Sequence, residues 1–107
     1  MRLYLDESVP EELRFFIQGH EVRTARFMGW KGWLDGEFLP IAQYEFDAMM
    51  TCDRSIPNQQ NLARLDLRII VLRGRTNGME HLLPLLPEAL RALDELGRGQ
   101  VVHIYPP

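Results

Sequence analysis

Short apolar runs separated by longer mixed stretches dominate the hydrophobic pattern of this chain. Five runs rich in β-branched and other large apolar residues predict strands at Arg2–Asp6, His20–Thr24, Asp47–Thr51, Leu67–Leu72 and Gln100–Ile104. The third run is almost continuously apolar, as expected of a central strand that is covered on both faces. Strands that alternate with helical stretches are typical of an α/β fold, here with a mostly parallel sheet of about five strands flanked by helices.

Three stretches between these strands predict helices, at Pro10–Gln18, Asp35–Tyr44 and Met79–Leu96. The first should bury Leu13, Phe16 and Ile17, which recur at three- and four-residue spacing. Proline lacks a backbone N–H group, so it should make the start of the second helix irregular and disturb the first half of the third. Residues 25–34 combine aromatic side chains with glycine and predict an irregular loop.

The composition is that of one compact globular domain spanning residues 1–107. The chain has 107 residues, of which 46% are apolar and 25% charged. A domain of this size buries a smaller fraction of its surface than a larger one does. Further apolar surface could therefore be buried against a partner protein or against a second copy in a homodimer.

The charge balance and the cysteine count limit the classes of protein that the chain can belong to. Twelve Lys and Arg residues against fifteen Asp and Glu residues give a formal net charge of -3, so nucleic-acid binding would need a local basic patch. The single cysteine, Cys52, cannot form an internal disulfide, and the start of the chain does not have the pattern of a secretory leader. No apolar run approaches the ~18 residues of a membrane span. These features predict a soluble cytoplasmic protein that does not bind membranes.

Acidic residues stand where two of the predicted strands end. Asp6 ends the first strand and Asp53 follows the third, and parallel strands bring their carboxyl ends to the same edge of a sheet, where such folds bind ligands. Asp35 and Glu37 begin the second helix, which is expected near the same edge. Residues two apart on a helix do not share a face, so only one of these two should point toward the site. Asp35 could instead cap the helix.

Carboxylates gathered at one edge predict a metal site. They repel one another unless a cation, a proton or a basic side chain neutralises them. An oxygen-only set suits Mg²⁺ or Mn²⁺ rather than zinc, and the three histidines are too scattered along the chain to suggest another metal. Asp6, Asp35 and Asp53 are therefore the predicted ligands, with Glu37 as the alternative to Asp35.

Several segments resemble, in order and over nearly the whole chain, the small PIN-like proteins of the DUF5615 group. The segments that carry the resemblance are Leu5–Pro10, Gly19–Ala25, Met28–Trp30, Asp35–Leu39 and Thr51–Asp53. The stretch Pro57–Asn61 is similar to a proline-then-Gln-Gln-Asn segment found in a subset of that group. The resemblance implies a three-layer, Rossmann-like PIN-type fold with an acidic site that uses a divalent metal to hydrolyse RNA.

The resemblance also implies partners and roles for individual residues. PIN-like proteins often form the toxin half of a toxin–antitoxin pair, so RNA and a cognate antitoxin protein are the expected partners. Asp6, Asp53 and either Asp35 or Glu37 match the family's acids. Nuclease members of the wider superfamily usually carry a further acid beyond the third strand, where this chain has Arg54 and amides. A non-catalytic module that binds a partner protein is therefore the alternative to a ribonuclease.

Basic and amide side chains on the predicted loops are candidates for RNA binding. These are Arg54, Gln59, Gln60, Asn61, Arg73 and Arg75. Guanidinium groups can bind phosphates in bidentate fashion, but exposed arginines are also ordinary surface residues. The amides can hydrogen-bond RNA or brace their own loop. We expect Phe27, Trp30 and Trp33 to cap the core or form a partner interface rather than stack on bases, and Met49, Met50 and Cys52 to lie in the core.

Overall fold

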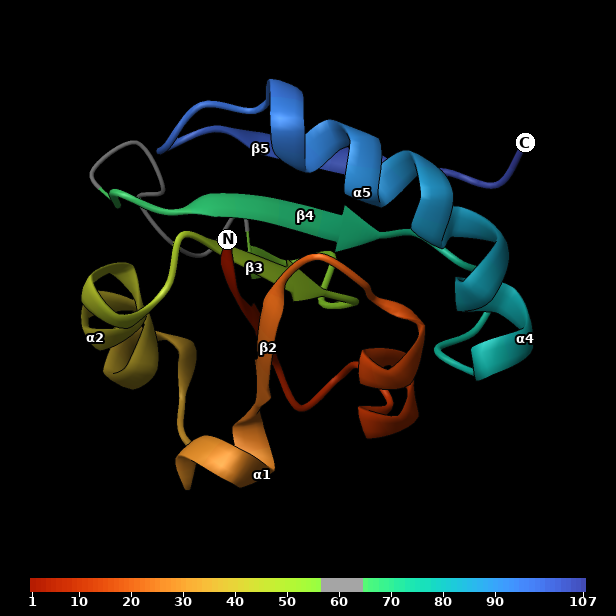
Figure 1. Ribbon diagram of the computed structural model, residues 1–107. Helices are drawn as coiled ribbons and strands as arrows, with labels where there is room; N and C mark the ends of the chain where they lie inside the picture. Colours follow the sequence, from red (N-terminus) through yellow and green to blue (C-terminus); the bar gives the residue numbers. More distant parts are fainter. Residues whose placement is uncertain (57–64) are drawn as a thin grey trace.

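Five parallel strands form one sheet in the computed structural model, which describes residues 1–56 and 65–107 (Figure 1). Their order across the sheet is β2-β1-β3-β4-β5. The strands are β1 (Arg2–Leu5), β2 (Glu21–Thr24), β3 (Ala48–Thr51), β4 (Arg68–Leu72) and β5 (Val101–Ile104). Each lies within one residue of the predicted bounds, and the predicted α/β class with a parallel sheet is confirmed.

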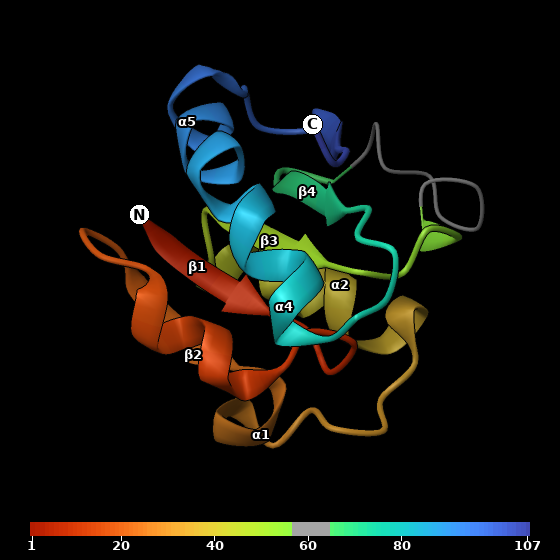
Figure 2. The same cartoon turned by 90° about the vertical axis from the view of Figure 1, so that its right-hand side faces the viewer.

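Helices cover both faces of the sheet, as Figures 1 and 2 show. One face carries η1 (Glu11–Phe16), α4 (Met79–Leu82), η3 (Leu83–Leu85) and α5 (Leu86–Glu95). The other face carries α1 (Ala25–Met28) and α2 (Asp35–Glu45). Side chains alternate between the faces of a strand, so Met49 packs under α2 while Met50 packs under α5. Both methionines are fully buried, and the prediction that they lie in the core is confirmed.

The first predicted helix differs from expectation in type and in what it buries. It is a 3-10 helix, η1, and Leu13 is its buried residue. Phe16 is 52% exposed, so the prediction that it faces the core was wrong. The helix ends at Phe16, and Ile17 is buried in an extended conformation, so the prediction that Leu13 and Ile17 face the core is confirmed.

The segment predicted as an irregular loop, residues 25–34, contains the short helix α1. Thr24 caps it, because its side-chain oxygen accepts a hydrogen bond from the Phe27 N–H group at 3.2 Å. Gly29 ends it in the left-handed conformation, with φ of 74°. The predicted interval Asp35–Tyr44 is helical and extends to Glu45 with Pro40 inside one uninterrupted α-helix, so the irregular start predicted for it was wrong. The third helix is interrupted, as predicted, by a 3-10 turn that contains Pro84. No helix among the described residues is long and apolar enough to cross a membrane.

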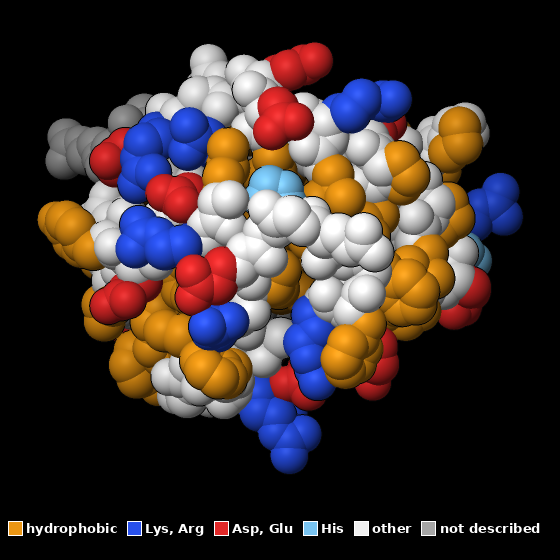
Figure 3. Space-filling model, viewed as in Figure 1, with side chains coloured by type: hydrophobic (Ala, Val, Ile, Leu, Met, Phe, Trp, Pro, Cys, Tyr) orange, Lys and Arg blue, Asp and Glu red, His pale blue; other side chains and the backbone are white. Residues whose placement is uncertain are grey.

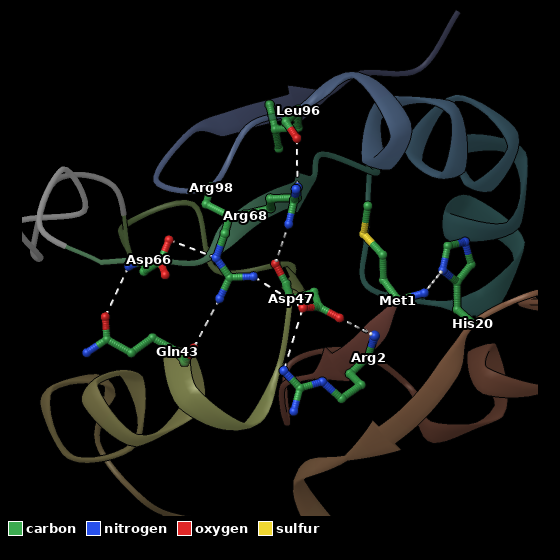
Figure 4. Close-up of polar contacts among 9 residues, drawn as sticks. All are labelled: Met1, Arg2, His20, Gln43, Asp47, Asp66, Arg68, Leu96 and Arg98. Carbon is green, nitrogen blue, oxygen red and sulfur yellow. Dashed lines mark hydrogen bonds and ion pairs between the residues drawn. The ribbon is translucent and has the colours of Figure 1, made fainter.

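A polar network ties together the amino ends of the central strands (Figure 4). The Asp47 carboxylate accepts a hydrogen bond from the Arg2 N–H group at 2.8 Å and pairs with Arg98 at 3.2 Å. Arg98 also pairs with Asp66 at 2.7 Å. The Arg2 N–H bond and the pairing with Arg2 and Arg98 lower the pKa of Asp47 below its ordinary value. The network joins β1 and β3 to the turns before β4 and β5.

We expect Asp47→Ala to lower the free energy of unfolding by about 1 to 2 kcal/mol at pH 7, because one charged hydrogen bond and two partly exposed ion pairs are lost. The pKa of Asp47 is lower in the folded state, so its contribution is complete above the unfolded pKa and disappears as the pH falls through the folded one. Urea unfolding at several pH values measures this. Asp94→Ala, at an exposed acid on α5, is the control and should lose no stability. Equal stability of Asp47→Ala and wild type at pH 7 would contradict the prediction.

Candidate functional site

A pocket of about 490 Å³ opens at the carboxyl ends of β1 and β3. These two strands are neighbours, and the chain leaves β1 toward one edge of the sheet and β3 toward the other. This is the switch point of a doubly wound sheet, the place where such folds bind ligands. The acidic side chains that line the pocket are Asp6, Glu7, Asp35 and Asp53.

Asp6 follows β1 and is the most buried acid of the pocket, with 7% of its surface exposed. The backbone pairing of β1 with β3 continues through it, since its N–H group donates to the Met50 carbonyl at 3.2 Å. One carboxylate oxygen accepts hydrogen bonds from the backbone and hydroxyl of Ser8, and the other accepts one from the Thr51 hydroxyl. Burial raises the pKa of Asp6 to about 6 against the effect of these hydrogen bonds, and the negative charge of Asp35 adds to the rise.

Two hydroxyl groups hold the loops after β1 and β3 together. Thr51, fully buried at the end of β3, donates to Asp6 and accepts a hydrogen bond from the Asp53 N–H group at 3.0 Å. The Ser8 hydroxyl accepts one from the Cys52 N–H group at 2.9 Å. Cys52 is buried, as predicted. The sequence reasoning missed Ser8 and Thr51 as parts of the site.

Asp53 is held by a local turn. Its Oδ1 atom accepts hydrogen bonds from the backbone N–H group of Ser55, at 2.9 Å, and from the Ser55 hydroxyl. The same arrangement, an acid bonded to a serine two residues later, occurs at Asp6 and Ser8. Acid-x-Ser spacing is a known turn-forming signal, and it could have identified both serines from the sequence.

Asp35 and Glu37 have different environments, although both lie in the first turn of α2. Asp35 is half-buried and lines the pocket. Burial raises its pKa, and the negative charges of Asp53 and Glu7 raise it further. Glu37 is exposed, and its carboxylate accepts a hydrogen bond from the Leu34 N–H group at 2.8 Å. The fold therefore brings Asp35, and not Glu37, together with Asp6 and Asp53, while Leu34 stands at the N-cap position considered for Asp35.

The carboxylates of the pocket lack basic partners within the part of the chain that the structure describes. There, no ion pair involves Asp6, Asp35 or Asp53. Within the same residues, no three acidic, histidine or cysteine side chains lie close enough together to hold a metal ion by themselves. The oxygen donors fit a hard, partly hydrated cation, because Mg²⁺ is bound through one or two carboxylates, with water and substrate phosphate completing its shell.

Aromatic side chains form one wall of the pocket. Tyr4 and Trp30 pack edge to face with their ring centroids 5.1 Å apart, and Phe38 lies 5.6 Å from Tyr4. Trp33 stacks on Trp30 at 6.0 Å and is partly exposed at the rim. Trp30 is buried and caps the core as predicted. Phe27 is exposed on α1, so the core-capping role considered for it was wrong.

The predicted RNA-binding arginines occupy the loops after β3 and β4. Arg54 donates to the Gly74 carbonyl at 2.9 Å and so connects these loops. Arg73 lies 3.2 Å from the His103 ring nitrogen and over the Tyr105 ring. Arg75 is exposed. Gln59, Gln60 and Asn61 lie outside the described residues.

Comparison with known proteins identifies no relative of this chain. No family model, curated protein or solved structure matches the chain. The resemblance to PIN-like proteins therefore rests on the sequence segments alone.

Proposed function

We propose that the protein is a ribonuclease that hydrolyses phosphodiester bonds with the help of Mg²⁺ or Mn²⁺ at the pocket between β1 and β3. One observation carries the proposal: Asp6, Asp35 and Asp53 come from three separate segments and line one pocket at the switch point of the sheet. The charges of these acids act on one another, because Asp35 raises the pKa of Asp6 and Asp53 raises that of Asp35, and a cation would relieve this repulsion. RNA as the substrate is supported by the resemblance to PIN-like proteins, which also supports a cytoplasmic toxin restrained by an antitoxin protein.

Asp6 and Asp53 would be the principal ligands. Their hydrogen bonds to Ser8, Thr51 and Ser55 fix the orientation of both carboxylates, as supporting residues do in metal sites. When bound, the cation would activate a water molecule and neutralise the charge that develops on the phosphate.

Asp35 is suited to accept a proton from the attacking water. Within the described residues its carboxylate makes no hydrogen bond, unlike those of Asp6 and Asp53. The pKa of Asp35 is raised by burial and by its acidic neighbours, which brings it closer to neutral pH and makes the carboxylate a better base. Trp33 at the rim and Trp30 behind it give the same pocket an apolar wall.

Cleavage of a labelled single-stranded RNA in Mg²⁺, Mn²⁺ or EDTA tests the proposal. We expect cleavage only with a divalent metal, and Asp35→Asn should lower the rate by about 10²- to 10⁴-fold, as expected for loss of a general base. Glu37→Gln should cleave like wild type, because Glu37 caps the helix instead of lining the pocket. Asp94→Asn is the surface control. Metal-independent cleavage, or an Asp35→Asn rate equal to that of wild type, would refute the proposal.

A non-catalytic interaction module is the second candidate, and one observation favours it. Helix α2 and its N-cap residue present exposed apolar side chains, Leu34, Ile41 and Tyr44, and hydrophobic residues gather over this helix at the lower left of Figure 3. If the wild type cleaves no RNA with either metal, and Ile41→Ser with Tyr44→Ala abolishes co-purification with a native partner, this candidate replaces the ribonuclease.

A further inference from the structure

Two further hollows continue from the acidic pocket toward the β2 edge of the sheet. The first, of about 230 Å³, shares Glu7 with the pocket and is lined by Arg26 and Lys31. The second, of about 470 Å³, shares Glu11 and Arg26 with the first and lies between η1, β2 and α1. Because each hollow shares lining residues with the next, the three lie next to one another, and the outer two are called here the cationic groove.

Basic side chains outnumber acidic ones in the outer hollow of the cationic groove, although the whole chain carries a net charge of -3 and the inner hollow is lined by two acids and two bases. Its outer hollow is lined by Arg14, Arg23 and Arg26 and by a single acid, Glu11. Arg26 pairs with Glu11 at 3.8 Å and Arg23 with Glu21 at 2.9 Å, and all four side chains are exposed enough for both pairs to be weak. A local excess of positive charge on an acidic protein attracts an anion to this face.

Exposed phenylalanines lie beside these arginines. Phe27 is 69% exposed, and the Arg23 guanidinium carbon stands 4.8 Å from its ring centroid. Phe15 is equally exposed, with Arg14 at 4.2 Å. Figure 3 shows blue basic and orange hydrophobic side chains next to each other, with red acidic ones between, over β2 and α1. Aromatic faces next to cations are the surface on which unpaired bases stack while their phosphates are neutralised.

We propose that the cationic groove binds the single-stranded RNA that extends from the acidic pocket, with phosphates on Arg23, Arg26 and Lys31 and a base on Phe27. The choice of RNA rests on the proposed function. The position of the groove next to the acidic pocket and the excess of positive charge in its outer hollow support binding of an anionic chain independently. Single-stranded RNA is favoured over a duplex, because the bases of a duplex are stacked within the helix and cannot lie on Phe27.

Fluorescence anisotropy with a labelled oligouridylate of about ten nucleotides tests the proposal, in EDTA so that binding is measured without cleavage. Arg23→Gln with Arg26→Gln should raise Kd at least about tenfold and lower the slope of log affinity against log salt by about 1.4, or 0.7 for each phosphate contact. Phe27→Ala should weaken binding by roughly 5- to 150-fold with an unchanged slope. Arg91→Gln and Tyr44→Ala, at exposed residues outside the groove, are the matched controls and should bind like wild type.

These measurements distinguish failure of the groove proposal from failure of the ribonuclease proposal. Both proposals are supported if the groove variants lose RNA binding while Asp35→Asn binds RNA like wild type but cleaves it more slowly. Groove-dependent binding without metal-dependent cleavage by the wild type supports the groove and refutes the ribonuclease. The groove proposal is overturned if both groove variants bind the oligouridylate like wild type. It is also overturned if the wild type does not bind the oligouridylate, or binds a duplex with equal affinity. Circular dichroism and thermal unfolding confirm that each variant is folded.

Discussion

Asp6→Asn should make the metal-free protein more stable at pH 8 while abolishing metal-dependent RNA cleavage. The pKa of Asp6 is about 6 in the folded state against 3.8 for a free aspartate. At about 1.4 kcal/mol for each pH unit by which a pKa changes, ionised Asp6 costs the folded state about 3 kcal/mol. The folded protein holds this proton more tightly, so wild-type stability falls as the pH rises from about 4 to above 6.

Asparagine removes this cost because it cannot ionise. Its amide oxygen can still accept from the Ser8 N–H group, and its amide nitrogen can donate to the Thr51 hydroxyl oxygen. Urea unfolding in EDTA should show equal stability of variant and wild type near pH 4 and a gain of up to about 3 kcal/mol for the variant at pH 8. Asp94→Asn should show no such pH-dependent gain. A variant that is less stable than wild type at pH 8 would contradict both the charge and the burial assigned to Asp6.

Thr51→Val should destabilise the protein by about 2 to 4 kcal/mol at pH 8, although the side chains have nearly the same shape. The substitution removes the hydroxyl that donates to Asp6 and accepts from the Asp53 N–H group. Two polar groups in a buried or partly buried setting then lack a partner, and each costs about 1 to 3 kcal/mol. The loss should be smaller at pH 4, where Asp6 is protonated and needs its donors less.

Thr51→Ser keeps the hydroxyl and should recover most of this stability, which separates the hydrogen bonds from the packing of the methyl group. A double-mutant cycle with Asp6→Asn isolates the contact between the two side chains, and we expect a coupling energy of about 1 kcal/mol or more. If Thr51→Val and Thr51→Ser are equally stable, the hydroxyl does not hold the two strand ends together.

The strand ends and their acids were predictable because both follow from local patterns. Runs of β-forming residues located every strand to within one residue, which placed Asp6 and Asp53 immediately beyond β1 and β3. Parallel pairing then required the two acids to approach the same edge. The sequence left the choice between Asp35 and Glu37 open. Helical spacing places the two side chains on different faces of the helix but does not determine which face points toward the pocket. The capping contact of Glu37 with Leu34 decides it.

Contacts between distant segments were not predictable in the same way. Leu13, Phe16 and Ile17 were assigned to the core from their spacing, but the helix stops at Phe16, which is exposed, while the other two are buried. The cationic groove unites η1, β2 and α1, whose arginines are separated in the sequence and look like ordinary surface residues there. The connections from β1 to β2 and from β4 to β5 cover the same face while the chain moves in opposite directions along the sheet. They therefore have opposite hands, although such crossovers are usually right-handed.

The sequence by itself determined that the protein is an α/β domain with acids at the ends of β1 and β3. Alternation of apolar and polar residues is a short-range property, and it specifies where a strand ends and which residue follows it. Tertiary structure alone decided that Thr51 and Ser8 join those ends, that Asp35 joins Asp6 and Asp53 in the pocket, and that three arginines line one hollow beside η1, β2 and α1. These features depend on which segments pack together, and that is settled by the burial of whole faces rather than by any local pattern.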